Sequence, residues 1–317
     1  MNAVPEVEAG SSSTTARSWR SATRQPAPLW RSLSRLRVAG RLPMEVEIRP
    51  PGGTLHADSA AAMKITVCQL HNGRDAFAMD WERLVAHVKA ERSDLVLLPE
   101  MPFFAWFPTP REFDPKVWHA AVAAHDAWEK RLSDLVPAVA LGTRPVDFGA
   151  LRYNAGFMWN ADEGIAETIH VKSCLANEEG FWETSWYGKA VPDFESATIG
   201  AVRVGMLIGL ELFVPEGART YGEDNVHIVA IPRVDRSSGD TEEGAVSNEE
   251  WLAGGRAVAL ESGAFCISSS RGIHANDGGG LGWILAPDGS TLARTSGDEV
   301  FVTAVVDLTD VRSTRLL

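Results

Sequence analysis

The sequence predicts an α/β fold in which sheets are packed between helices, and two observations lead to that prediction. From Met63 onward, short apolar or alternating runs typical of strands alternate with longer segments whose apolar residues recur at helical spacing. In addition, residues 155–159 and 165–169 flank a turn-rich interval and predict a hairpin. Strands that alternate with helices, with hairpins added, favour sheets covered by helical layers.

The first half of the domain supplies the expected elements in a regular order. Residues 64–70 alternate as a strand with β-branched content, and residues 77–88 carry an apolar stripe at helical spacing. Residues 95–98 are wholly apolar, which predicts an interior strand. A second helix is expected over residues 115–135, and a further strand over residues 138–141.

The second half is organised around the apolar run from Val204 to Ile208, which predicts a buried strand. The run stops at Gly209, and the chain then turns toward a helix that begins near Pro215. Gly263 is expected to end a later helix. The remaining elements are strands at 226–231, 265–268, 282–285 and 300–306, a helix at 248–261, and a turn at 287–289.

Composition narrows the classes of function. The chain has 317 residues and a net charge of -12, which argues against a nucleic-acid or acidic-membrane partner. No run approaches the ~18 consecutive apolar residues that a membrane helix needs. Cys68, Cys174 and Cys266 form no C-x-x-C pair, and the histidines lack metal-ligand spacing. We therefore expect a cytoplasmic protein without a metal or another cofactor.

Residues 1–62 differ from the rest of the chain. They are rich in Ser, Thr, Arg, Pro and Ala and lack a persistent hydrophobic period, so we expect a disordered extension or a start codon assigned too early. The Arg and Ser content is also typical of a transit peptide, but Glu6, Glu8, Glu45 and Glu47 argue against one. Residues 63–317 are expected to form a single domain.

Three positions share one context, since each lies just beyond a predicted strand: Glu100, Lys172 and Gly209. Because the ends of neighbouring strands converge in an α/β sheet, these positions are expected to line one crevice. Desolvation would raise the pKa of Glu100 and suit it to act as a general base, and Lys172 could stabilise an oxyanion. For any one of them alone, a solvated strand boundary is the simpler interpretation.

The sequence motifs around these three positions resemble those of a known protein family. Asp94-Leu95-Val96-Leu97-Leu98-Pro99-Glu100, His170-Val171-Lys172 leading to Asn177-Glu178-Glu179-Gly180-Phe181-Trp182, and Val204-Gly205-Met206-Leu207-Ile208-Gly209-Leu210-Glu211 occur in this order. In order and spacing the three blocks resemble the nitrilase superfamily of carbon–nitrogen hydrolases. The resemblance spans about Met63 to Leu308. Further matches are the segments 152–155, 213–216, 256–261 and 287–289.

The resemblance implies a four-layer αββα sandwich with a glutamate base, a lysine and a cysteine nucleophile. Carried over by position, Glu100 is the base and Lys172 the oxyanion stabiliser. Glu179 matches the additional glutamate that positions substrate and lysine, with Glu178 and Glu183 as alternatives. The resemblance also implies a small amide, nitrile or N-carbamoyl ligand and a homodimer or higher homo-oligomer formed through the helical layers.

The resemblance also assigns residues around the expected pocket. The backbone N–H of Leu210 would complete the oxyanion hole. Phe104, Trp106, Phe181 and Trp182 are expected to wall the pocket, although core packing would equally account for each aromatic side chain.

One departure from the family pattern decides the chemistry, because Gly209 occupies the position of the cysteine. Glycine cannot form the covalent intermediate. Cys174 lies close to Lys172 in sequence, but its side chain is expected to project elsewhere. Two hypotheses follow: weak or altered hydrolysis, with a water placed by Glu100, or a pseudoenzyme that binds a small carbonyl ligand or an oligomeric partner. The glycine is compatible with a natural replacement and with a laboratory knockout.

Overall fold

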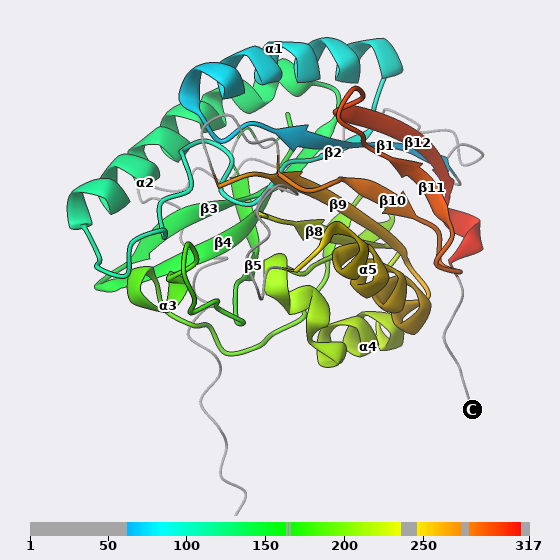
Figure 1. The fold of residues 1–317 in the computed structure, drawn as a ribbon. Helices are drawn as coiled ribbons and strands as arrows, with labels where there is room; N and C mark the ends of the chain where they lie inside the picture. Colours follow the sequence, from blue (N-terminus) through cyan, green and yellow to red (C-terminus); the bar gives the residue numbers. More distant parts are fainter. Residues whose placement is uncertain (1–61, 163, 165, 236–245, 274–278, 312–317) are drawn as a thin grey trace, which may run out of the picture.

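The computed structural model describes residues 62–162, 164, 166–235, 246–273 and 279–311 (Figure 1). The predicted N-terminal extension lies outside the described residues, apart from Ala62, which begins the first strand. The strands are β1 (Ala62–Leu70), β2 (Leu95–Leu97), β3 (Val139–Phe148), β4 (Leu151–Trp159), β5 (Ala166–Val171), β6 (Ala197–Ile199), β7 (Val202–Met206), β8 (Ile228–Pro232), β9 (Phe265–Arg271), β10 (Trp283–Leu285), β11 (Thr291–Arg294) and β12 (Phe301–Asp307). The helices are α1 (Arg74–Glu91), α2 (Pro115–Glu129), α3 (Glu183–Trp186), α4 (Pro215–Glu223) and α5 (Asn248–Ser262), with 3₁₀ turns η2 (Lys130–Leu135), η3 (Gly209–Phe213) and η4 (Leu308–Asp310).

The strands form one mixed, nearly closed sheet with two halves. Its hydrogen-bonded order in the described chain is β5-β4-β3-β2-β1-β9-β8-β7-β6, with β12 beside β1 and β10 between β9 and β11. β1, β2 and β3 run parallel in one half, and β7, β8 and β9 run parallel in the other. The halves join where β1 pairs with β9, at Gln69–Ser270 and Leu70–Arg271.

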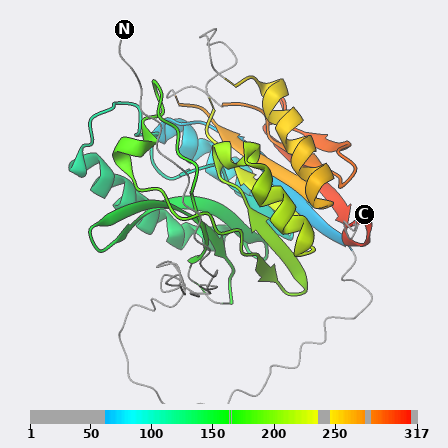
Figure 2. The same cartoon turned by 90° about the horizontal axis from the view of Figure 1, so that it is seen from below.

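The two halves face each other across an apolar core, and helices cover their outer faces (Figures 1 and 2). Along β2, Leu95 and Leu97 point into the central core, whereas Val96 packs against the layer that contains α1. Near β7, Ile208 points inward and Leu207 packs toward α4 and α5. This alternation follows from the two-residue period of extended chain and confirms the four-layer αββα sandwich.

Most predicted elements are confirmed, with identifiable local causes. The stripe on α1 is buried through Phe77, Trp81, Leu84, Val85 and Val88. In α5, Ser247 and Glu250 form a capping box, and Gly263 ends the helix in the left-handed conformation at φ 64°. No helix in the described part of the chain is long and apolar enough to cross a membrane.

The sequence prediction was wrong in detail at several strands. The strand expected at 138–141 continues to Phe148, because β3 and β4 pair as a long antiparallel hairpin. The apolar run at 204–208 extends beyond its strand, since β7 ends at Met206 and residues 207–208 lead into η3. β6 and β11 were not predicted; both are short and carry partly exposed side chains, so neither shows a buried apolar run.

Candidate active site

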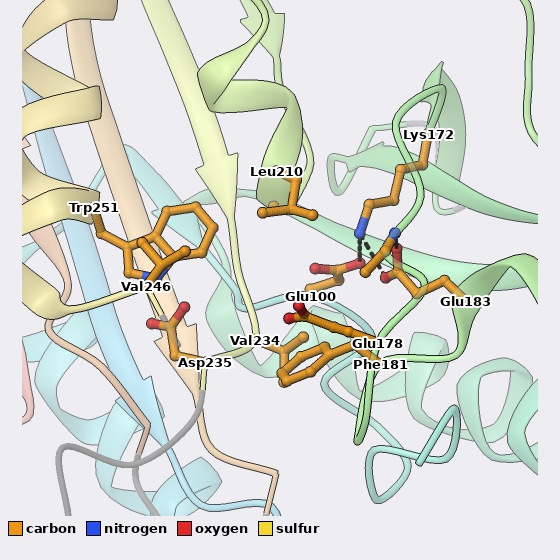
Figure 3. A pocket seen from close by; sticks show the side chains of 12 residues that line it. Glu100, Lys172, Glu178, Phe181, Glu183, Leu210, Val234, Asp235, Val246 and Trp251 are labelled. Carbon is orange, nitrogen blue, oxygen red and sulfur yellow. Dashed lines mark hydrogen bonds and ion pairs between the residues drawn. The ribbon is translucent and has the colours of Figure 1, made fainter. Parts of the chain in front are cut away.

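Three segments bring the predicted site residues together at one end of the sheet. Glu100 follows β2, Lys172 comes directly after β5, and Gly209 opens η3 after β7. Figure 3 shows the side chains of Glu100 and Lys172 converging with that of Glu183 in one pocket. The expectation that strand ends gather these positions in one crevice is therefore met by the geometry.

A lysine held between two carboxylates forms the centre of this pocket. The ammonium Nζ of Lys172 lies 2.7 Å from Oε1 of Glu100 and 2.6 Å from Oε1 of Glu183, and all three side chains are almost fully buried. The Asn154 side-chain amide donates a second hydrogen bond to Oε1 of Glu100, at 2.7 Å. Buried charges need such partners, so this cluster fixes the three groups in one arrangement.

Burial and neighbouring charges set the protonation states of Glu100 and Lys172. Burial raises the pKa of Glu100 to about 7, although the positive charge of Lys172 opposes this shift. Burial alone would lower the pKa of Lys172, but the charges of Glu100 and Glu183 outweigh burial and raise it. Lys172 therefore stays cationic near neutral pH, while Glu100 is able to exchange a proton there. A base with its pKa near the working pH suits proton transfer.

The second carboxylate is Glu183, on α3, and not the predicted Glu179. Besides Lys172, Glu183 accepts hydrogen bonds from the Tyr187 hydroxyl at 2.7 Å and from the Ala176 backbone N–H at 2.7 Å. Glu179 is exposed to solvent and does not line the pocket. Sequence alone could not separate Glu178, Glu179 and Glu183, because the fold of the intervening loop decides which carboxylate is buried.

Position 209 faces Glu100 and Lys172, although the glycine there has no side chain. Gly209 adopts the left-handed backbone conformation, with φ +55°. A Cβ added there would lie 3.0 Å from Oε2 of Glu100 and 3.1 Å from Nζ of Lys172. Any functional group carried at position 209 would therefore contact both a base and a cation.

A buried glutamate that the sequence analysis did not single out connects the turn at Gly209 to the lysine segment. Oε2 of Glu211 accepts a hydrogen bond from the Ile208 backbone N–H at 2.8 Å and lies 2.7 Å from Nε2 of His170. Its Oε1 accepts from the N–H and the hydroxyl of Ser173, each at 2.6 Å. A charged residue directly after a buried apolar run was the available signal, since such a charge requires buried partners.

The pocket lined by Glu100, Lys172 and Gly209 has an empty volume of ≈470 Å³, which includes its open mouth. Phe181 lines it as predicted, and Leu210, whose backbone N–H is expected to complete the oxyanion hole, also lies in its wall. Trp106 does not line the pocket directly but packs against Phe181, with ring centroids 5.7 Å apart. The other lining residues are Glu100, Lys172, Ala176, Glu178, Glu183, Gly209, Val234, Asp235, Val246 and Trp251.

The two other predicted wall residues lie elsewhere. Phe104 lines a separate groove between α1 and α2, together with Phe103 and Trp128. Trp182 packs beneath the guanidinium of Arg111, whose Cζ lies 5.1 Å from the ring centroid. Aromatic residues near a site in sequence therefore divide between the pocket wall and other packing contacts, and composition cannot separate the two.

The three cysteines are not placed among the residues that line this pocket. Cys68 and Cys266 are buried in β1 and β9, where burial raises the pKa of both thiols. Cys174 is half-buried, and burial also raises the pKa of its thiol. Among the described residues, no group of three or more His, Cys, Asp or Glu side chains is arranged to hold a metal ion.

Comparison with known proteins agrees with the fold and identifies the family. No curated protein sequence matches the chain at a significant level. A carbon-nitrogen hydrolase from Helicobacter pylori G27 is similar in structure, with a TM-score of 0.65, 19% identity, and coverage of 79% of this chain and 91% of that one.

An amidase from Nesterenkonia sp. AN1 is also similar. Its cysteine-to-alanine mutant in complex with butyramide has a TM-score of 0.60 and 17% identity, and the match covers 80% of this chain and 95% of that one. A second mutant, with the acetamide moiety of fluoroacetamide attached at the active-site cysteine, has a TM-score of 0.62 and 16% identity, covering 81% and 95%. The family model for carbon-nitrogen hydrolases matches residues 64–316, so this chain belongs to the carbon-nitrogen hydrolase family.

Proposed function

We propose that the pocket binds a small carboxamide, nitrile or N-carbamoyl compound and hydrolyses its carbon–nitrogen bond slowly, without a covalent intermediate. The observation that carries this proposal is the buried lysine clamped by Glu100 and Glu183, directly facing position 209. Burial of such a charged cluster costs desolvation energy. A site that binds a polar carbonyl group needs these charges, which explains why they are buried at this position.

In the proposed reaction, the scissile carbon of an amide lies next to Gly209. Lys172 and the backbone N–H of Leu210 hold the carbonyl oxygen and stabilise the negative charge that develops on it. Glu100 takes a proton from a water molecule as the water oxygen attacks the carbon. The same proton then passes to the leaving nitrogen, so that one water and one amide give a carboxylic acid and ammonia.

The glycine sets the expected rate. In a nucleophile-dependent mechanism, an attacking side chain divides one difficult step into two easier ones. With glycine at position 209, water must attack directly, and we expect turnover to be several orders of magnitude below that of a site with a nucleophile. The butyramide complex of the Nesterenkonia mutant supports the binding half of the proposal, since that mutant binds an amide with the small residue alanine in place of a cysteine.

A second candidate is a pseudoenzyme that binds the ligand without turnover, and the absent side chain at Gly209 favours it. Ammonia release from a panel of aliphatic amides, measured beside direct binding, separates the two. Slow release that stops in Glu100→Gln supports hydrolysis. Binding without release supports the pseudoenzyme, whereas neither binding nor release contradicts both.

The placement of Glu183 gives a matched pair of variants. Glu183→Gln should lower the free energy of unfolding by roughly 2 kcal/mol and weaken amide binding, because it removes a charged partner from buried Lys172. Glu179→Gln changes an exposed side chain and should shift stability by less than about 0.5 kcal/mol. Urea unfolding of both variants checks this, and an equal loss in the two would contradict the assignment.

Two further expectations stay predictions. A homodimer or larger homo-oligomer is expected through a helical layer, and light scattering of the purified chain would test it. A cytoplasmic location is likewise predicted from the charge and the separated cysteines.

A further inference from the structure

Two charged side chains that line the pocket, Glu178 and Asp235, take no part in the proposed reaction. Glu178 lines the pocket but belongs neither to the lysine cluster nor to the turn at Gly209. In Figure 3 its carboxylate points into the space between Glu100 and Val234, away from the contacts of Lys172. A ligand that extends outward from the reacting carbon would pass this carboxylate.

The backbone fixes Glu178 in this position. Its N–H donates to the carbonyl oxygen of Phe181 at 3.3 Å, and the Phe181 N–H donates back to the Glu178 carbonyl oxygen at 2.9 Å. Phe181 is itself packed against Trp106. The carboxylate is thus held at the pocket wall by a closed turn, while its side chain remains exposed to solvent.

The other charged groups described around the pocket pair with one another or with neighbouring residues, and none of them neutralises the carboxylate of Glu178. Lys172 is already held by two carboxylates, Glu100 and Glu183. Asp235 pairs with the buried Arg233 at 2.7 Å and also accepts from the Ser270 hydroxyl. Within the described residues, the carboxylate of Glu178 has neither a hydrogen bond nor an ion pair.

The charges of the residues that line the pocket therefore favour a ligand with a positive charge. Among the described residues that line the pocket, Lys172 alone carries a positive charge, and its ammonium is held beside position 209, at the reacting end of the ligand. A ligand carboxylate would meet Glu178 without a cation to pair with, and like charges repel. A ligand ammonium would meet an available carboxylate, with attraction that salt weakens.

We infer that Glu178 is a specificity-determining residue that selects amides with a positively charged amino group at the end remote from the carbonyl and disfavours those with a carboxylate there. This inference rests on the proposed amide-binding function and narrows its substrate class to ω-amino amides. Glu178 contacts the remote end of the ligand and takes no part in proton transfer.

Three compounds with the same three methylene groups test the inference: 4-aminobutyramide, pentanamide and glutaramate, which are cationic, neutral and anionic. Dissociation constants are measured by titration calorimetry on the full chain. In the unmodified protein, 4-aminobutyramide should bind about five-fold tighter than pentanamide, and glutaramate about five-fold weaker, as expected for a solvent-exposed charge pair. Raising the salt concentration should reduce both differences.

Variants at adjacent glutamates assign the effect. Glu178→Gln should bring the three dissociation constants close together, and Glu178→Lys should reverse their order. Both change an exposed side chain and should leave the fold intact. Glu179→Gln, a neighbouring exposed carboxylate outside the pocket lining, should keep the unmodified order and serves as the control.

The outcomes separate this inference from the proposal beneath it. If pentanamide binds but glutaramate binds as tightly as 4-aminobutyramide, or if Glu178→Gln keeps the preference, the specificity inference is overturned and amide binding stands. If none of the three compounds binds to the unmodified protein, the amide-binding proposal fails and the inference fails with it.

Discussion

A cysteine placed at position 209 should react with iodoacetamide about a hundred times faster at pH 6 than an ordinary exposed thiol. The Cβ of that residue would lie 3.1 Å from the ammonium of Lys172, which favours the thiolate, and 3.0 Å from Glu100, which is able to accept the thiol proton. A thiol with its pKa lowered from ~8.5 to about 6 is half ionised at pH 6. The reactive fraction therefore rises by roughly two orders of magnitude.

The experiment carries its own controls. Peptide mass spectrometry distinguishes position 209 from Cys68, Cys174 and Cys266, the thiols whose pKa values are raised by burial. Glu100→Gln in the same background should slow alkylation at position 209. A side chain at φ +55° is strained, so Gly209→Cys should also lose about 1–3 kcal/mol of stability. Alkylation no faster than that of a free thiol would mean that the site does not activate a nucleophile.

Replacing Lys172 with methionine should have the largest effect on stability, a loss of about 3–5 kcal/mol at pH 8. Methionine preserves most of the volume but leaves the carboxylates of Glu100 and Glu183 buried without a cation. Lys189→Met, which changes an exposed lysine nearby, should shift the free energy of unfolding by less than about 0.5 kcal/mol. Denaturant unfolding at several pH values measures both variants.

The pH dependence of the Lys172→Met variant has a defined sign. The folded-state pKa of Glu100 is already raised to about 7, and removal of the lysine cation raises it further. A carboxyl group with a raised folded pKa binds its proton more tightly in the folded state, so stability falls as pH rises from ~4.5 through the folded pKa. In the unmodified protein this fall is complete near pH 7, whereas in the variant it continues to higher pH, so the deficit of the variant should shrink as the pH falls from 8 toward 7. A deficit that is constant between pH 5 and 8 would contradict the buried ion cluster.

Much of the fold could be predicted because its determinants are local. The wholly apolar run of β2, the apolar stripe on α1 and the glycine that ends α5, Gly263, each depend on a few consecutive residues. The residues at which strands begin and end were predicted less well. β3 extends to Phe148 because β4 pairs with it, and pairing between segments is not visible in either segment alone.

The candidate site divides in the same way. Glu100, Lys172 and Gly209 could be found because each lies just beyond a strand that the sequence predicts. Glu183 was not chosen, since only the folded loop shows that its carboxylate is buried while Glu179 is exposed. Glu211 was missed because its partners, His170 and Ser173, come from a segment about forty residues earlier, and long-range polar contacts leave little trace in a local pattern.

The most direct test of the account is turnover by the Gly209→Cys variant. Ammonia release from the amide that binds best to the unmodified chain is compared among the unmodified chain, Gly209→Cys, and Gly209→Cys combined with Glu100→Gln. We expect the cysteine to raise the rate at least about a hundredfold, an acyl group to be detectable on the peptide containing residue 209, and the double variant to lose the gain. If the cysteine variant releases no more ammonia than the unmodified chain and carries no acyl group at position 209, this pocket is not a carbon–nitrogen hydrolase site that lacks only its nucleophile.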